Sequence, residues 1–189
     1  MYFDFMFSFS LIPFQARLQA LVVMVMEALD GEELSRKYHY SIVGHSGDDS
    51  AIPLGAEFGC PPKTAKERFA LIKRMVAHSE YCSSGDSSLE ALREGVKKVA
   101  EEEADDYFLL LVSDANLSRY GVDPSEFGAE LSRNPEVNAF ALFIASFDNE
   151  AESMKSKMPL GKAHVTFDTA QIPSVFRQIF ASTSFMRDQ

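Results

Sequence analysis

The stretch DYFLLLVSDANLSRYG, residues 106–121, decides the fold. Its five consecutive apolar residues, 108–112, are too few for a helix of ordinary length, but they suit a strand buried on both faces of a parallel sheet. The run ends at Ser113 and Asp114, which would follow the carboxyl end of that strand. Ligands of open α/β sheets bind at this edge. Asp114 is therefore either a carboxylate that faces a ligand or a residue that caps the next turn, a position that aspartate also favours.

The composition is that of a folded, acidic protein. Apolar residues make up 46% of the 189 positions and charged residues 24%, which is ordinary for one globular domain. The net charge is −10 and no block of Lys and Arg occurs, which argues against nucleic acid or an anionic membrane as the main partner. A divalent cation or a basic partner protein fits the sign of the charge better. No apolar run approaches the length of a membrane span.

The cysteines and the first residues bear on the cellular compartment. Cys60 and Cys82 show no paired spacing, which is typical of a reducing, intracellular compartment. Residues 1–15 are rich in phenylalanine and contain neither Lys nor Arg. They therefore lack the basic start of a secretory signal and the arginines of a mitochondrial presequence. This segment is either a first strand or the remnant of a truncated start.

Helical patterns alternate with short apolar runs along the rest of the chain. The expected strands are 38–43, 51–54, 108–112, 137–145 and 163–167, and the expected helices are 17–29, 63–79, 87–103, a short one opened by Pro124, 149–158 and 173–182. This alternation predicts right-handed crossovers and an α/β, Rossmann-like, doubly wound and mostly parallel sheet. Strands 108–112 and 137–144 should be parallel neighbours. In the second helix, Phe69, Ile72 and Val76 should lie on one side.

The loop Val43-Gly44-His45-Ser46-Gly47 approaches the nucleophile elbow Gly-x-Ser-x-Gly of α/β hydrolases. That motif needs a second glycine where this chain has Asp48, and a helix directly after it. The sequence runs instead to Pro53, and no Asp-then-His pair follows in the required order. A hydrolase that uses Ser46 is the alternative function, and His45 is explained more simply as a strand-end residue.

The loop SGDSSLE, residues 84–90, leads directly into a helix and has two interpretations. Asp86 or Ser87 could cap the helix, with Glu90 completing a capping box. Alternatively, the loop presents a hydroxyl to a hard cation that Asp114 also binds, because Mg²⁺ prefers oxygen ligands. No Gly-x-x-x-x-Gly-Lys-Ser/Thr loop occurs, so the chain has no ATP site of that kind.

Three stretches together carry a family resemblance: YSIVGHSGD (40–48), SGDSSLE (84–90) and EEADDYFLLLVSDANLSRYGVDP (102–124). With VMVMEAL, NPEVNAFALFIAS and IPSVFRQIF, they resemble the carboxyl-terminal von Willebrand factor A (vWA) domain of a large AAA-type ATPase, over residues 16–183. The resemblance implies a protein-binding module, not an enzyme, with a metal-ion-dependent adhesion site for Mg²⁺. It also implies a mitochondrial location, and the ATPase module of such relatives is absent from this chain.

The family builds its metal site from Asp-x-Ser-x-Ser after the first strand, a Thr in a second loop and an Asp after the fourth strand. By this resemblance Ser88 stands at the Thr position and Asp114 at the last Asp, so both are predicted metal ligands. No Asp-x-Ser-x-Ser occurs. Either residues 1–15 are a divergent or truncated start before a single domain at 16–189, or Met6, Ser8 and Ser10 occupy the motif, with Met in place of Asp.

Both alignments lose the carboxylate that anchors the metal, and a thioether is a poor ligand for magnesium. We therefore expect Mg²⁺ to bind in the millimolar range or weaker, where ~1 mM corresponds to about 4 kcal/mol. Met6→Asp should tighten binding if the second alignment holds. We also expect residues 2–9 to fill the central position of the sheet as a strand, and Ser88 and Asp114 to lie close together at its carboxyl edge.

Overall fold

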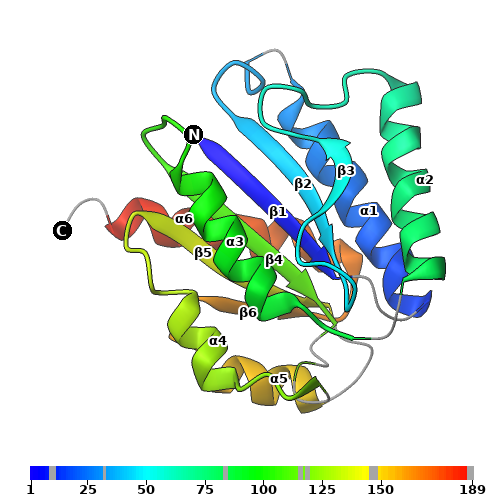
Figure 1. Ribbon diagram of the computed structural model, residues 1–189. Coiled ribbons are helices and arrows are strands. Elements are labelled where there is room, and N and C mark those ends of the chain that lie inside the picture. Colours follow the sequence, from blue (N-terminus) through cyan, green and yellow to red (C-terminus); the bar gives the residue numbers. More distant parts are fainter. Residues whose placement is uncertain are drawn as a thin grey trace.

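A six-stranded sheet runs through the middle of the molecule, with helices on both faces (Figure 1). The computed structural model describes residues 1–8, 12–31, 33–82, 85–114, 117, 120–144 and 149–186. The strands are β1 (Tyr2–Ser8), β2 (His39–His45), β3 (Ile52–Ala56), β4 (Tyr107–Ser113), β5 (Val137–Ile144) and β6 (Ala163–Thr166). Their order is β3-β2-β1-β4-β5-β6, and only β3 is antiparallel to its neighbour. The predicted Rossmann-like sheet is confirmed, as is the parallel pairing of β4 with β5.

The helices form two layers (Figure 1). They are α1 (Ile12–Leu29), α2 (Ala65–Tyr81), α3 (Ser88–Ala100), α4 (Pro124–Glu130), α5 (Asn149–Ser156) and α6 (Ile172–Met186), with a 3₁₀ turn, η2 (Thr169–Gln171), before α6. Apolar side chains of α1, α2 and α6 share one core with the sheet, and those of α3, α4 and α5 share the other. No helix within the described ranges is long and apolar enough to cross a membrane.

Strand β1 fills the central position of the sheet, as the sequence predicts. It pairs in parallel with β2 over Tyr2–Ser8 on one side and with β4 over Tyr2–Phe7 on the other. Phe3, Phe5 and Phe7 enter the core beneath α1 and α6, while Met6 enters the core beneath α3. The alternation of these side chains follows from the two-residue period of a strand. The first residues of the chain are therefore part of the same sheet as the rest.

Asp4 is fully buried in β1, which requires compensation for its charge. The Ser41 hydroxyl donates a hydrogen bond to its carboxylate, and Lys98 reaches down from α3 to lie 3.8 Å from Asp4 Oδ1 and 3.1 Å from Ser41 Oγ. Burial raises the pKa of Asp4, and the Lys98 charge and the Ser41 hydrogen bond partly oppose that rise. Gly95 lets α3 lie close to β1, because a Cβ at this position would lie only 2.5 Å from Met6 Sδ.

The buried face of α2 is not centred on the side that Phe69, Ile72 and Val76 share. Thr64 and Glu67 form a capping box that starts the helix, and its buried residues are Leu71 and Met75. Phe69, which shares one side of the helix with Ile72 and Val76 in the sequence pattern, is 64% exposed. The ammonium group of Lys73 lies 5.7 Å from the centre of the Phe69 ring, a cation–π contact at the surface.

Candidate functional site

The carboxyl ends of β2, β1 and β4 lie side by side, so the loops that follow them share one edge of the sheet. Ser8, the last residue of β1, is in register with His45, the last residue of β2. Asp114 follows Ser113 at the end of β4 and is half-buried. Because parallel strands bring their carboxyl ends to the same edge, Asp114 lies where ligands of such folds bind.

Ser88 is the first residue of α3 and its side chain is completely buried. Its backbone N–H donates a 2.6 Å hydrogen bond to Asp86 Oδ1, whereas the Ser87 side chain makes no capping bond. The capping role predicted for Asp86 or Ser87 therefore belongs to Asp86. The Ser88 hydroxyl lies near enough to lower the pKa of Asp86, yet it makes no hydrogen bond of good geometry. A buried polar group without a hydrogen bond typically lowers the free energy of unfolding by about 1–3 kcal/mol.

Asp86 connects the two predicted metal ligands electrostatically. Burial raises the pKa of the Asp86 carboxyl, and the negative charges of Asp114 and Glu90 raise it further, whereas the nearby Ser88 hydroxyl and the Ser88 backbone N–H lower it. Asp86 therefore lies within electrostatic reach of Asp114 and in contact with Ser88. The direct approach of Ser88 to Asp114 stays a prediction. Sequence pattern predicts only a capping role for Asp86, although its position two residues before Ser88 is the available signal.

The loop after β2 packs against the loop that carries Asp86. A Cβ added to Gly85 would lie 2.7 Å from the Gly47 Cα, so the two backbones approach closely and Gly85 has no room for a side chain. The same loop is fixed to α2, because Ser46 Oγ lies 3.2 Å from His78 Nε2. Burial lowers the pKa of His78, and the nearby charges of Asp48 and Asp49 partly oppose this effect. Asp48 and Asp49 therefore follow directly after Gly47, and Asp86 directly after Gly85, where the two loops approach each other.

The geometry around Ser46 does not form a nucleophile elbow. Ser46 is only 1% exposed, and its hydroxyl accepts a 3.2 Å hydrogen bond from the Asp48 backbone N–H. The chain continues into β3, an edge strand, and not into a helix. His45 is fully buried, which lowers its pKa to about 3 and keeps the imidazole neutral. The Ser46–His78 contact, which the sequence did not predict, joins a loop to a helix and is closed to solvent on the Ser46 side.

Met6 does not lie at the carboxyl edge. Its side chain is 1% exposed and packs against α3 close to Gly95, two residues inside the end of β1. At the rise of a strand this separation is roughly 7 Å. A carboxylate at Met6 would therefore be buried on the same face as Asp4 instead of facing a ligand. Ser8 ends β1 at the edge, and Ser10 lies outside the described residues.

The donor set at this edge fits a metal ion only in part. Within the portion of the chain that the structure describes, no three His, Cys, Asp or Glu side chains converge so as to hold a metal. Asp86, Asp114 and the Ser88 hydroxyl are the oxygen donors that could contribute. Mg²⁺ requires six oxygen ligands in nearly octahedral array, so water or a partner would have to supply the remainder.

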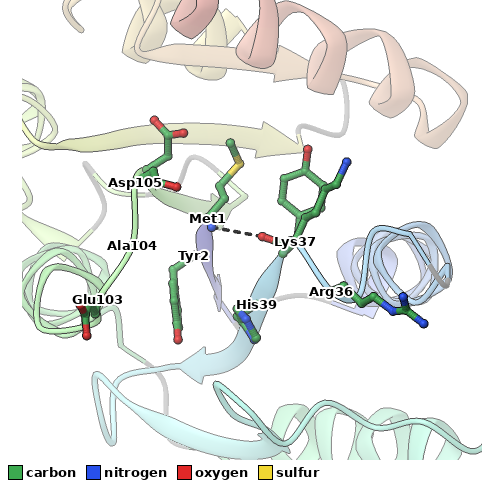
Figure 2. A pocket seen from close by; sticks show the side chains of 10 residues that line it. Met1, Tyr2, Arg36, Lys37, His39, Glu103, Ala104 and Asp105 are labelled. Carbon is green, nitrogen blue, oxygen red and sulfur yellow. Dashed lines mark hydrogen bonds between the residues drawn. The ribbon is translucent and has the colours of Figure 1, made fainter.

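A hollow lies at the opposite, amino-terminal edge of the sheet (Figure 2). Its volume is about 750 Å³, and its lining includes basic residues on one side and acidic residues on the other: Met1, Tyr2, Arg36, Lys37, Tyr38, His39, Glu103, Ala104, Asp105 and Asp106. The terminal amine of Met1 donates to the Lys37 carbonyl at 3.2 Å, and the Tyr2 ring stacks on His39. None of the predicted site residues lines this hollow.

Comparison with known proteins identifies the family. Mouse von Willebrand factor A domain-containing protein 8 is 44% identical over 162 residues, which are 86% of this chain and 8% of that protein. The chain belongs to the von Willebrand factor A domain family. This vWA domain thus spans only a small part of the length of that relative. No protein-family model matches the sequence.

Two solved structures share the vWA-like fold at 11% sequence identity. The pilus adhesin SpaC from Lactobacillus rhamnosus GG, in its open conformation, has a TM-score of 0.69 and covers 96% of this chain with 30% of its own. The conserved hypothetical protein BatB from Bacteroides thetaiotaomicron has a TM-score of 0.62, with 97% of this chain and 98% of its own covered. At such low identity these similarities establish the fold of the vWA domain alone.

Proposed function

We propose that this vWA domain is a protein-binding module without enzymatic activity, and that its partner binds at the carboxyl edge of the sheet. The proposal is supported by Asp86, which accepts a hydrogen bond from the backbone N–H of buried Ser88 and lies within electrostatic reach of Asp114. By resemblance to its family, the domain belongs to, or derives from, a vWA-containing AAA-type ATPase of mitochondria. Its role would then be to recruit a protein to that ATPase.

The adhesion site of the domain is degenerate in this proposal. The Ser88 hydroxyl and the Asp114 carboxylate would hold Mg²⁺, and Asp86 would add a third oxygen ligand nearby. Because the sequence has no carboxylate directly after β1, where the family places one, the ion needs several waters to complete its coordination. When bound, Mg²⁺ would supply an open coordination position to a carboxylate of the partner. We expect its dissociation constant to be millimolar or higher.

Site-specific photo-cross-linking tests the location of the partner surface. A benzophenone side chain at Asp49, which is exposed beside Asp86's loop, should capture a discrete protein in cells that express the native relative. The same group at exposed Glu103, on the amino-terminal edge, is the matched control and should not. Capture should fall when Asp114→Asn is added to the Asp49 variant. Equal capture from both edges, or no effect of Asp114→Asn, would contradict the proposal.

A further inference from the structure

Helix α2 is a basic element in an acidic chain. Of the 18 Lys and Arg residues, five lie in residues 63–81, which are α2 and the two residues before it. Only two of the 28 Asp and Glu residues lie in the same segment, although the net charge of the whole chain is −10. The charge of this helix is therefore opposite in sign to that of the chain around it.

One side of α2 carries apolar side chains that the core does not cover. Leu71 and Met75 fill the core from the inner side of the helix, whereas Phe69 is 64% exposed and Ile72 and Val76 are only half-buried. The last three residues share one side because they are spaced three and four positions apart. Helix α2 lies at the outside of its layer, packed beside α1 and β3 (Figure 1). These residues therefore form a short apolar stripe that solvent reaches.

Two exposed lysines, Lys66 and Lys73, flank this stripe. The Lys73 ammonium group lies 5.7 Å from the centre of the Phe69 ring, and Lys66 precedes Phe69 by three positions, so that the two are neighbours on the helix surface. Neither lysine has an acidic residue three or four positions away, which is the spacing of ion pairs along a helix. We call Lys66, Phe69, Ile72, Lys73 and Val76 the basic ridge.

The spacing of the basic ridge matches that of a second helix. Lys66 and Lys73 are seven residues apart, which is two helical turns and about 10 Å along the axis. On a partner helix that lies along α2, two carboxylates seven residues apart repeat at the same distance. An apolar residue three or four positions from each carboxylate then meets Phe69, as in the docking of amphipathic helices through anchors at such spacings.

We propose that the basic ridge docks an acidic amphipathic helix of a partner protein. Carboxylates of that helix pair with Lys66 and Lys73, and an apolar side chain between them covers Phe69 and Val76. Charge complementarity selects this partner, because an acidic helix is attracted to α2 and repelled by the acidic surface elsewhere. The inference goes beyond the proposed function and does not rest on it, since the basic ridge shares no residue with the site at the carboxyl edge.

Two fluorescein-labelled helical peptides test the proposal by fluorescence anisotropy, in a buffer with EDTA so that no metal contributes. The acidic peptide consists of three repeats of Glu-Gln-Ala-Leu-Leu-Gln-Ala, and the basic peptide has Lys in place of each Glu. We expect the acidic peptide to bind and the basic peptide not to bind. Phe69→Ala and Lys73→Glu should each lower the affinity for the acidic peptide about tenfold. Added NaCl should weaken binding as well, because salt screens exposed ion pairs.

Leu160→Ala and Lys97→Glu are the matched controls, because they make similar changes at exposed positions outside α2, and they should leave the affinity unchanged. Thermal melting followed by circular dichroism checks that all four variants are folded. Equal binding of the two peptides, or equal losses in the ridge and control variants, would overturn the inference. A dimer in sedimentation that Phe69→Ala dissociates would also overturn it, since a second copy would then occupy the ridge. Binding to phosphatidylserine vesicles in place of the acidic peptide would overturn it in favour of a membrane surface.

Discussion

Lys98→Met should destabilise the protein at neutral pH by removing the only described cation that pairs with buried Asp4. Breaking a fully buried ion pair costs about 3–5 kcal/mol, because the remaining charge is left without compensation. Lys98 is 42% exposed, so solvent already screens this pair, and we expect a loss of about 2–3 kcal/mol. For a chain of this length that corresponds to a fall in melting temperature of roughly 4–12 °C.

The loss should depend on pH in a defined direction. Burial raises the pKa of Asp4 above its value in the unfolded chain, and the Lys98 charge opposes that rise. The folded state therefore binds a proton more tightly than the unfolded state, and stability falls as pH rises from the unfolded pKa through the folded pKa. Without Lys98 the folded pKa rises further, so the Lys98→Met variant should recover stability on acidification from pH 7 to pH 5.

Urea denaturation at pH 7 and pH 5 measures this effect. Lys98→Met should be the less stable variant by about 2–3 kcal/mol at pH 7, and by clearly less at pH 5. In an Asp4→Asn background, which has no buried charge to compensate, Lys98→Met should cost less than about 1 kcal/mol. A loss that is equal at both pH values, or equal in the Asp4→Asn background, would show that Lys98 acts through packing on Phe58 instead.

Three further tests by urea denaturation concern the packing and capping of the helices. Leu71→Ala should cost about 2–5 kcal/mol because Leu71 is fully buried, whereas Phe69→Ala on the exposed side of α2 should change stability by less than about 1 kcal/mol; the reverse order would refute the assigned face. Gly95→Ala should destabilise by about 1–3 kcal/mol, because its methyl group would overlap Met6 and Leu109, and an unchanged melting temperature would contradict that close approach. Thr64→Ala should cost about 1 kcal/mol by removing the capping box of α2, and Glu67→Ala should match it if the two act together.

Most of the fold follows from local sequence pattern, whereas its buried polar contacts do not. The apolar run at β4 and the turn residues after it predict a central parallel strand, and Tyr2–Ser8 fills the slot beside it. The charge of Asp4 argues against burial of that first strand. The residue that compensates this charge, Lys98, comes from a helix far along the chain. Sequence periodicity cannot show such a distant pair.

The site was predicted less completely than the fold. Ser88 and Asp114 fall at the expected edge, since loop position follows directly from the alternation of strands and helices. Asp86 was treated as a helix cap, and it does cap α3, but it also lies within electrostatic reach of Asp114. The contact of Ser46 with His78 joins residues from separate elements, and no local pattern indicates it. The sequence pattern groups Phe69 with Ile72 and Val76 on one side of the helix, whereas Leu71 and Met75 occupy the core.

A magnesium titration tests most directly the claim that the adhesion site of this vWA domain is degenerate. The chemical shifts of the Ser88 and Asp114 amides are followed in the unaltered chain and in Met6→Asp. Dissociation constants of millimolar or higher are expected for the unaltered chain, and no gain is expected from Met6→Asp, because that side chain lies in the core beneath α3. Micromolar affinity in the unaltered chain would contradict the account, since it would require a complete set of metal ligands at this edge.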